Sequence, residues 1–199
     1  FTQTYNREGL LISLYESLKK QTFKDFEWLI VDDGSVDNTN ETVQQFIKEN
    51  ILNISYYYKE NGGKQRAYNY ALDNAKGELF ICLDSDDEYV SNALEIILEY
   101  WKKVEKNAKI VGMGYLSTYP DGSTIGSEFP NDEMVETQFN IYNKYKVTGD
   151  KGLMFRTEVI KNDKVPVFDG EKFTTEALVY NRIAEKYEML YINEKIEIK

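Results

Sequence analysis

The 199-residue chain contains no histidine and only one cysteine, Cys82. Without histidine, neither Ser-His-Asp nor Cys-His catalysis can operate, and with one cysteine a typical zinc site is disfavoured as well. A single cysteine also cannot form an intramolecular disulfide. Any general base must therefore be a carboxylate or, less often, Lys or Tyr. Any metal must be held mainly by oxygen ligands, which favours Mg²⁺, Mn²⁺ or Ca²⁺.

The sequence also lacks a hydrophobic run close to the ~20 residues of a membrane span, and no signal peptide is visible in it. Acidic residues outnumber basic ones by 34 to 24, and the net charge of −10 disfavours nucleic acid as a partner. The chain opens at Phe1 without an initiator Met or a complete first strand, so we expect a cut first strand. The alternating segment that ends at Lys199 is compatible with continuation of the chain.

Helical and strand patterns alternate over the first hundred residues. The predicted elements are helices over 7–20, from Thr39, around Ala67–Ala71 and from Ser91 to Trp101, and strands over 26–31, 54–58 and 79–83. Thr39 and Ser91 are the predicted N-caps of their helices. Such alternation predicts an α/β fold, in which a mostly parallel sheet is flanked by helices.

The second half of the chain is less regular. The predicted elements are strands over 110–116 and 153–155, a hairpin turn over 119–123, and a helix over 176–184. The polar segment 128–147 is weakly patterned and is predicted to be a loop or a mobile lid. The length of the chain suits one domain.

The sequence Asp84-Ser85-Asp86-Asp87 follows five apolar residues, at the predicted end of a buried strand. Carboxylates this close repel one another, and a hard divalent cation would remove that cost. The cation would also hold a diphosphate and stabilise the charge that develops on it as a leaving group. The alternative is a solvated acidic turn. An EF-hand loop is rejected, because Tyr89 stands where that loop needs glycine.

Two further turns could contact a nucleotide. Asp32-Asp33-Gly34-Ser35 also follows a strand, and its carboxylates could accept from a nucleobase N–H or from ribose hydroxyls. In parallel sheets ligands bind beyond such strand ends. Asn61-Gly62-Gly63-Lys64-Gln65-Arg66 places two cations at a glycine turn that opens a helix, which suits phosphate binding. The alternatives are an ordinary turn and a solvated loop, and both the Rossmann and P-loop glycine signatures are missing.

Taken in order, five segments resemble the signature of glycosyltransferase family 2. They are Thr4-Tyr5-Asn6-Arg7; Gln21-Thr22-Phe23-x-Asp25-Phe26-Glu27; Val31-Asp32-Asp33-Gly34-Ser35-x-Asp37-x-Thr39; Asn61-x-Gly63 with Ala67 and Asn69; and Gly77-Glu78 before Leu83-Asp84-Ser85-Asp86-Asp87. The resemblance covers about the first 100 residues, with one further anchor around Glu176. No single segment is decisive, but the ordered set is specific.

The resemblance implies a GT-A fold and a metal-dependent enzyme that transfers a sugar, with inversion, from a nucleotide-diphospho-sugar to an acceptor hydroxyl. UDP-sugar is the favoured donor, Mg²⁺ or Mn²⁺ the cofactor, and a saccharide or lipid-linked molecule the acceptor. It further implies bacterial cell-surface polysaccharide or glycan synthesis in the cytoplasm, at the inner face of the membrane. We expect residues 1–199 to form a single domain, with a nucleotide-binding half over 1–100 and an acceptor-side half over 101–199 that forms a smaller, mixed part of the fold.

The resemblance also implies roles for individual residues. Tyr5 would lie against the base, Asp33 would meet the base edge, and Asp84 and Asp86 would form the Asp-x-Asp motif, with Asp86 the direct metal ligand. The donor-binding set implied is Thr4, Tyr5, Arg7, Asp33, Lys64, Asp84 and Ser85, with Arg66 as a second choice to Lys64.

Glu176 occupies the position of the family's catalytic base, six residues before Arg182. Thr175 stands where the family has another acidic residue. The simpler alternative is that Glu176 is an acid in the first turn of a helix, where the dipole favours one.

Two other functions stay open at this point. A GT-A-like nucleotidyltransferase would share the sheet and the acidic site, but the Thr2–Arg7 segment lacks the glycine run that such an enzyme needs. A catalytically inactive sugar-nucleotide module, or a carbohydrate- or Ca²⁺-binding module, is hinted at only by Thr175. UDP binding without turnover would indicate such a module.

Overall fold

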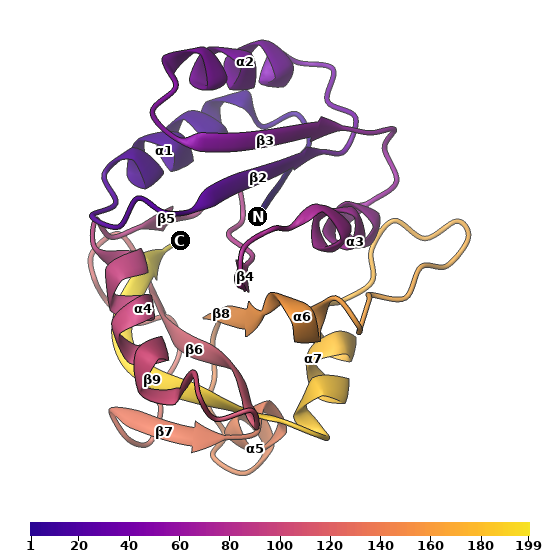
Figure 1. Cartoon of the computed structure of the whole chain (residues 1–199). Helices are drawn as coiled ribbons and strands as arrows, with labels where there is room; N and C mark the ends of the chain where they lie inside the picture. Colours follow the sequence, from indigo (N-terminus) through magenta and orange to yellow (C-terminus); the bar gives the residue numbers. More distant parts are fainter.

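The computed structural model describes residues 1–199 and contains two sheets with helices packed around them (Figure 1). The helices are α1 (Glu8–Lys19), α2 (Thr39–Glu49), α3 (Lys64–Asn74), α4 (Ala93–Val104), α5 (Gln138–Asn143), α6 (Thr157–Ile160) and α7 (Ala177–Ala184). The strands are β1 (Thr2–Thr4), β2 (Glu27–Asp32), β3 (Asn53–Tyr58), β4 (Leu79–Ile81), β5 (Glu88–Tyr89), β6 (Ile110–Thr118), β7 (Glu133–Glu136), β8 (Lys151–Arg156) and β9 (Glu188–Ile198).

The first sheet is parallel, in the order β1-β2-β3. Successive side chains of β2 point to opposite faces, and both faces are covered. Trp28 and Ile30 belong to a core cluster with residues of α1 and α2, whereas Leu29 and Val31 belong to another with residues of α3. A strand that is buried on both faces reads as a continuous apolar run, which is why the sequence predicted it correctly.

The second sheet is mixed, in the order β4-β8-β6-β9-β5, with β7 paired to β9. Only β6 and β9 run parallel within it, and the other pairs are antiparallel. The two sheets meet at Phe1, whose amino group donates to the Ile81 carbonyl (2.7 Å) and whose carbonyl accepts from the Leu83 N–H (2.9 Å). The segments that follow β1, β2, β3 and β4 therefore lie along one edge.

Three sequence predictions need correction. The segment 128–147 is not a featureless loop, because β7 pairs with β9, and α5 begins after Thr137, whose hydroxyl accepts from the Asn140 N–H. Thr39 is the first residue of α2 rather than its cap, and α4 begins at Ala93 after Asn92, so Ser91 is not its cap either. The Ser91 carbonyl instead accepts from the Thr22 N–H (2.9 Å).

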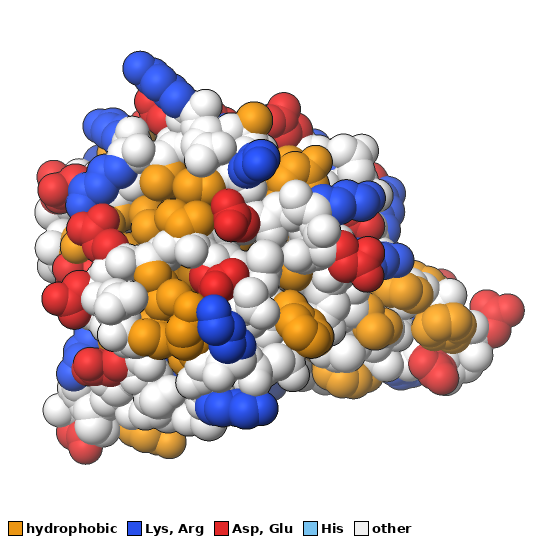
Figure 2. Space-filling model, turned by 90° about the horizontal axis from the view of Figure 1, so that it is seen from below, with side chains coloured by type: hydrophobic (Ala, Val, Ile, Leu, Met, Phe, Trp, Pro, Cys, Tyr) orange, Lys and Arg blue, Asp and Glu red, His pale blue; other side chains and the backbone are white.

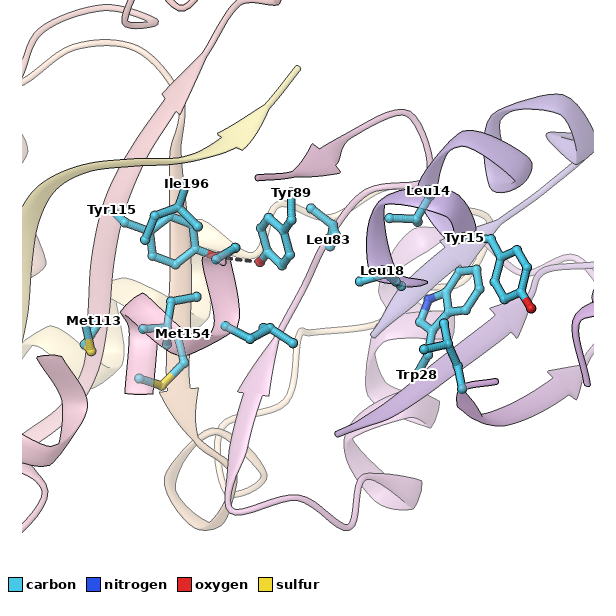
Figure 3. Packing of buried hydrophobic residues seen from close by; sticks show 14 of the residues in the cluster. Leu14, Tyr15, Leu18, Trp28, Leu83, Tyr89, Met113, Tyr115, Met154 and Ile196 are labelled. Atoms are coloured by element: carbon cyan, nitrogen blue, oxygen red, sulfur yellow. Dashed lines mark hydrogen bonds between the residues drawn. The ribbon is translucent and has the colours of Figure 1, made fainter. Parts of the chain in front are cut away.

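The core joins both halves of the chain. Figure 3 shows Leu14, Leu18 and Trp28 of the first half in the same cluster as Met113, Met154 and Ile196, with the hydroxyls of Tyr89 and Tyr115 hydrogen-bonded at 2.7 Å. An apolar cavity of about 430 Å³ lies near the amino ends of β2 and β4, and none of the predicted site residues lines it. None of the helices has the length and apolar character that a membrane crossing requires.

Candidate active site

Four loops at the carboxyl ends of β1 to β4 bring the predicted site residues together. They contribute Tyr5–Arg7, Asp33–Val36, Lys59–Gly63 and Leu83–Asp87. The fifth contribution comes from the other half of the chain, where residues 161–176 reach from α6 towards α3 and return to α7 (Figure 1). Glu176 is the last residue before α7 and lies within this group through its contact with Lys64 (3.5 Å).

Each of the three aspartates in residues 84–87, called here the acidic turn, has its own basic partner. Lys64 Nζ lies 3.1 Å from Asp84, Arg7 Nη1 lies 3.0 Å from Asp86, and Lys199 Nζ lies 2.6 Å from Asp87. Arg7 also donates to the Ser85 hydroxyl at 3.1 Å. The sequence predicted that carboxylate repulsion in this turn calls for a cation. In the folded chain, basic side chains from three distant segments offset that repulsion.

The turn could still hold a divalent metal together with a substrate. The side chains of Asp84 and Asp86 are 42% and 50% exposed, so a metal could reach them. No group of three or more acidic, Cys or His side chains is placed to hold an ion by itself. Mg²⁺ is commonly held in this way, by one or two carboxylates together with substrate phosphates. The residues present therefore fit a metal that binds together with a diphosphate, and they do not form an all-protein cage.

Asp33 is 1% exposed and is already heavily engaged. Its carboxylate accepts from Lys59 Nζ, from the Gly62 N–H (3.0 Å) and from the Gly63 N–H (2.8 Å). A carboxylate offers about four acceptor positions, and these donors take three of them. Asp33 thus holds the loop after β3 in place, and its contact with a nucleobase stays a prediction.

The loop after β1 is fixed against the loop after β2. Asn6 has φ 52°, its N–H donates to the Ser35 hydroxyl (2.8 Å), and its side-chain carbonyl accepts from the Val36 N–H (2.8 Å). Asn and Asp tolerate this left-handed backbone better than other non-glycine residues do. In this loop conformation Tyr5 is 46% exposed at the edge of the site, where its ring can contact a planar ligand. Thr4 is buried.

Lys64 connects the acidic turn to Glu176. Its ammonium is 3.1 Å from Asp84 Oδ1 and 3.5 Å from Glu176 Oε1. Burial acts to lower the pKa of Lys64, but the carboxylates of Asp84 and Glu176 act against it, and the net shift is upward. Lys64 is therefore a permanent positive charge between two carboxylates. Burial in turn raises the pKa of Cys82 to about 12, so this residue stays a thiol.

Glu176 has a partly enclosed side chain, 16% exposed. Thr175, at the position where the resembled family has another acid, accepts from the Ala177 N–H at 3.2 Å and so helps to begin α7. Arg182 donates to the Lys164 carbonyl (2.8 Å) and pairs with Asp163 (3.5 Å), and no ion pair joins it to Glu176. The structure thus brings Glu176 to the site and leaves Arg182 outside it.

Residues 165–176, called here the strap, cross over the start of α3. Arg66 donates to the carbonyls of Glu171 (3.0 Å) and Phe168 (3.2 Å), and Lys172 donates to the Asn61 side chain (2.9 Å). The strap projects from the body in Figure 2, with hydrophobic side chains along it. Sequence reasoning missed this role of Arg66, because nothing local to Arg66 indicates a contact about 100 residues away.

Gly63 has to be glycine for the strap to pack. Its φ is +92°, and a Cβ there would overlap the Lys172 carbonyl. We expect Gly63→Ala to lower the free energy of unfolding by more than the ~1–2 kcal/mol that a left-handed backbone costs. Chemical denaturation tests this, with Gly122→Ala as the matched control, because Gly122 also has positive φ (+81°) but open space around it. Equal losses in the two variants would contradict the packing role.

Residues 1–163 match the family model described as Glycosyl transferase family 2, and the chain belongs to that family. It is 30% identical over 206 residues to the GalNAc(5)-diNAcBac-PP-undecaprenol beta-1,3-glucosyltransferase of Campylobacter jejuni, an alignment that covers 98% of this chain and 62% of that protein. The predicted family is thereby confirmed. The chain spans less than two thirds of that relative's length.

The fold is that of GT-A glycosyltransferases, as predicted. The chain superposes on S. aureus TarS 1–349 in complex with UDP with a TM-score of 0.83 and 23% identity, over 100% of this chain and 59% of that one. It also superposes on the mannosyltransferase PcManGT of Pyrobaculum calidifontis, in complex with GDP-Man and Mn²⁺, with a TM-score of 0.69 and 18% identity, over 100% and 55% of the two chains. At these identities the likeness shows the fold alone.

Proposed function

We propose that this chain is the catalytic part of a metal-dependent, inverting glycosyltransferase that uses a UDP-sugar. The observation that supports it most is the position of Lys64, within 3.5 Å of both Asp84 and Glu176. Lys64 thus connects Asp84, which we propose to lie at the donor diphosphate, with Glu176, which we propose to be the base. UDP in the TarS complex and Mn²⁺ in the mannosyltransferase complex agree with this choice of donor and metal.

The donor diphosphate would bind above the acidic turn. Without a nucleotide, Lys64 and Arg7 neutralise Asp84 and Asp86, and both cations have side chains long enough to turn to phosphate oxygens instead. Asp86, the more exposed carboxylate, would be the direct ligand of Mg²⁺ or Mn²⁺, with Asp84 orienting it. The metal supplies Lewis-acid stabilisation of the diphosphate when bound. Tyr5 and Asp33 would meet the base, with Thr4 and Ser85 completing the donor site.

Glu176 would act as the general base. It accepts the proton of an acceptor hydroxyl as that oxygen forms a bond to the anomeric carbon, and the bond from this carbon to the diphosphate breaks on the opposite face. The ion pair with Lys64 holds the carboxylate in place between the acceptor and donor sides. The sugar product is therefore inverted at the anomeric carbon.

The acceptor would approach from the strap and the mixed sheet, that is, from the second half of a single catalytic domain. Val167, Phe168 and Phe173 on the strap, which ends at Glu176, are 43%, 52% and 65% exposed. Such side chains suit an acceptor with an apolar carrier, and the Campylobacter relative is named for an undecaprenol-linked acceptor. We therefore place the reaction in bacterial cell-surface glycan synthesis, on the cytoplasmic face of the membrane.

Calorimetry of UDP binding tests the proposal first. We expect binding with Mn²⁺ and a large loss of affinity in EDTA, followed by release of UDP when UDP-sugars and acceptors are supplied. Binding of UDP with no turnover across a broad acceptor set would indicate an inactive module instead. Pyrophosphate release from a nucleoside triphosphate would indicate a nucleotidyltransferase.

A further inference from the structure

The third aspartate of the acidic turn has a different environment from the other two. Asp84 and Asp86 are partly exposed, but Asp87, the last residue of the turn before β5, is only 5% exposed. Its carboxylate contacts Lys199 at 2.6 Å and shares no cation with its neighbours. Its N–H donates to the Asp84 carbonyl at 3.1 Å and closes the turn. The position of Asp87 therefore constrains the position of Asp84.

The Lys199 ammonium contacts three carboxylates. Besides Asp87, it contacts Glu197 at 2.6 Å and Asp150 at 3.1 Å. Glu197 is 3% exposed, and it lies opposite Tyr89 in the pairing of β5 with β9. The Lys199 N–H donates to the Thr118 carbonyl of β6 at 2.9 Å. Lys199 thus ties the acidic turn to the centre of the mixed sheet.

The charges make this arrangement strongly dependent on Lys199. Burial raises the pKa of Glu197 to about 7, and the Lys199 ammonium opposes that shift. Burial also acts to lower the pKa of Lys199, but Glu197 and Asp87 outweigh it and the net shift is upward. Removing the ammonium would leave two buried carboxylates close together, a situation that proteins avoid.

We propose that Asp87 and Lys199 are positioning residues for the metal and donor site, and that Lys199 keeps Asp87 away from the metal. This inference rests on the proposed function. With Asp87 anchored, the metal would meet only Asp84 and Asp86, and the diphosphate would complete its coordination. A third protein carboxylate on the ion would make metal binding less dependent on the nucleotide, and it would occupy a coordination position that the diphosphate uses, so Mn²⁺-dependent UDP binding would weaken. The anchor therefore couples binding of the metal to binding of the donor.

The test compares Asp87→Asn, Lys199→Met and Lys199→Arg in the full chain by calorimetry of UDP, with Mn²⁺ and with EDTA. We expect Asp87→Asn and Lys199→Met to weaken Mn²⁺-dependent UDP binding by about 10–100-fold, as is usual for groups that orient metal ligands. Binding in EDTA should stay as in the unmodified chain. Lys199→Arg should restore most of the affinity, and the double variant Asp87→Asn with Lys199→Met should be no weaker than the weaker single variant.

Lys103→Met is the matched control, because Lys103 forms an exposed pair with Glu133 (2.7 Å) away from the turn, and it should bind UDP normally. If Lys199→Met does not fold, Asp87→Asn carries the test, since Lys199 keeps its contact with Glu197. Normal Mn²⁺-dependent binding in Asp87→Asn would overturn the proposal. So would a complete loss in Asp87→Asn together with normal binding in Lys199→Met, because Asp87 would then be a metal ligand.

Hydrogen exchange separates this inference from the proposed function. In the absence of ligand, we expect amides over residues 83–90 to exchange faster in Asp87→Asn than in the unmodified chain, because the anchor of the turn is lost. Unchanged exchange would overturn the anchor whatever the chain binds. Absence of Mn²⁺-dependent UDP binding in the unmodified chain would instead overturn the proposed function, and the exchange measurement would still decide on the anchor.

Discussion

Replacing Glu176 by glutamine is expected to reduce sugar transfer by about 10²–10⁴-fold, the usual contribution of a general base. Glutamine has nearly the same shape but an amide that cannot take up the acceptor proton. Lys64 remains available to the donor phosphates in this variant, so UDP binding should be unchanged. Steady-state transfer with a UDP-sugar and calorimetry of UDP measure the two quantities separately.

Glu171→Gln is the matched control for this prediction. Glu171 is an exposed acid on the same strap, and its contacts with Gln65 and Arg66 use only its main-chain carbonyl. Transfer by this variant should be close to that of the unmodified chain. Near-normal turnover by Glu176→Gln would remove Glu176 from the role of base. A parallel loss of UDP binding would show that the residue supports the donor site instead.

Replacing Asp86 by alanine is expected to remove metal-dependent UDP binding, with a loss of at least about 100-fold in affinity in the presence of Mn²⁺. The substitution deletes the more exposed of the two candidate ligands and releases Arg7 from its ion pair (3.0 Å). Binding in EDTA should change little, because it does not use the metal. Titration of UDP into the variant, with Mn²⁺ and with EDTA, gives both values.

Asp25→Ala serves as the control for the loss of an acidic side chain. Asp25 is exposed and lines the apolar cavity near the amino end of β2, at the edge of the sheet away from the acidic turn. It should bind UDP as the unmodified chain does. Persistent Mn²⁺-dependent binding by Asp86→Ala would show that the metal is held elsewhere, and Asp84→Ala would then be the next variant to measure.

Much of the first half could be predicted from periodicity alone. The helix predicted over 7–20 is observed over Glu8–Lys19, and the strand predicted over 26–31 is observed over Glu27–Asp32. Both elements bury wide apolar faces, and such faces leave a clear period in the sequence. Residues 128–147 gave no such signal, because β7 and α5 are short and bury only part of their surface against neighbours.

The candidate site divides in the same way. That Asp33 and Asp84 to Asp87 lie just beyond strand ends follows from the sequence, because the predicted strands run directly into those residues. The sequence could not show that Lys59 and two glycine N–H groups donate hydrogen bonds to the Asp33 carboxylate. It could not show either that the strap crosses α3 through Arg66. These contacts join segments with no local relation, and no periodic pattern records them.

The sequence by itself determined most of the helices and strands of the first half, the family, and the placement of acidic residues at one edge of the sheet. Hydrophobic period and turn chemistry act over a few residues, so these features can be read locally. The tertiary structure alone decided which cation meets which carboxylate. Asp87 is paired with Lys199, 112 positions away, because the pairing of β5 with β9 brings the two side chains together. The sequence shows that these carboxylates need positively charged partners. Which basic residue becomes the partner depends on how distant strands pack.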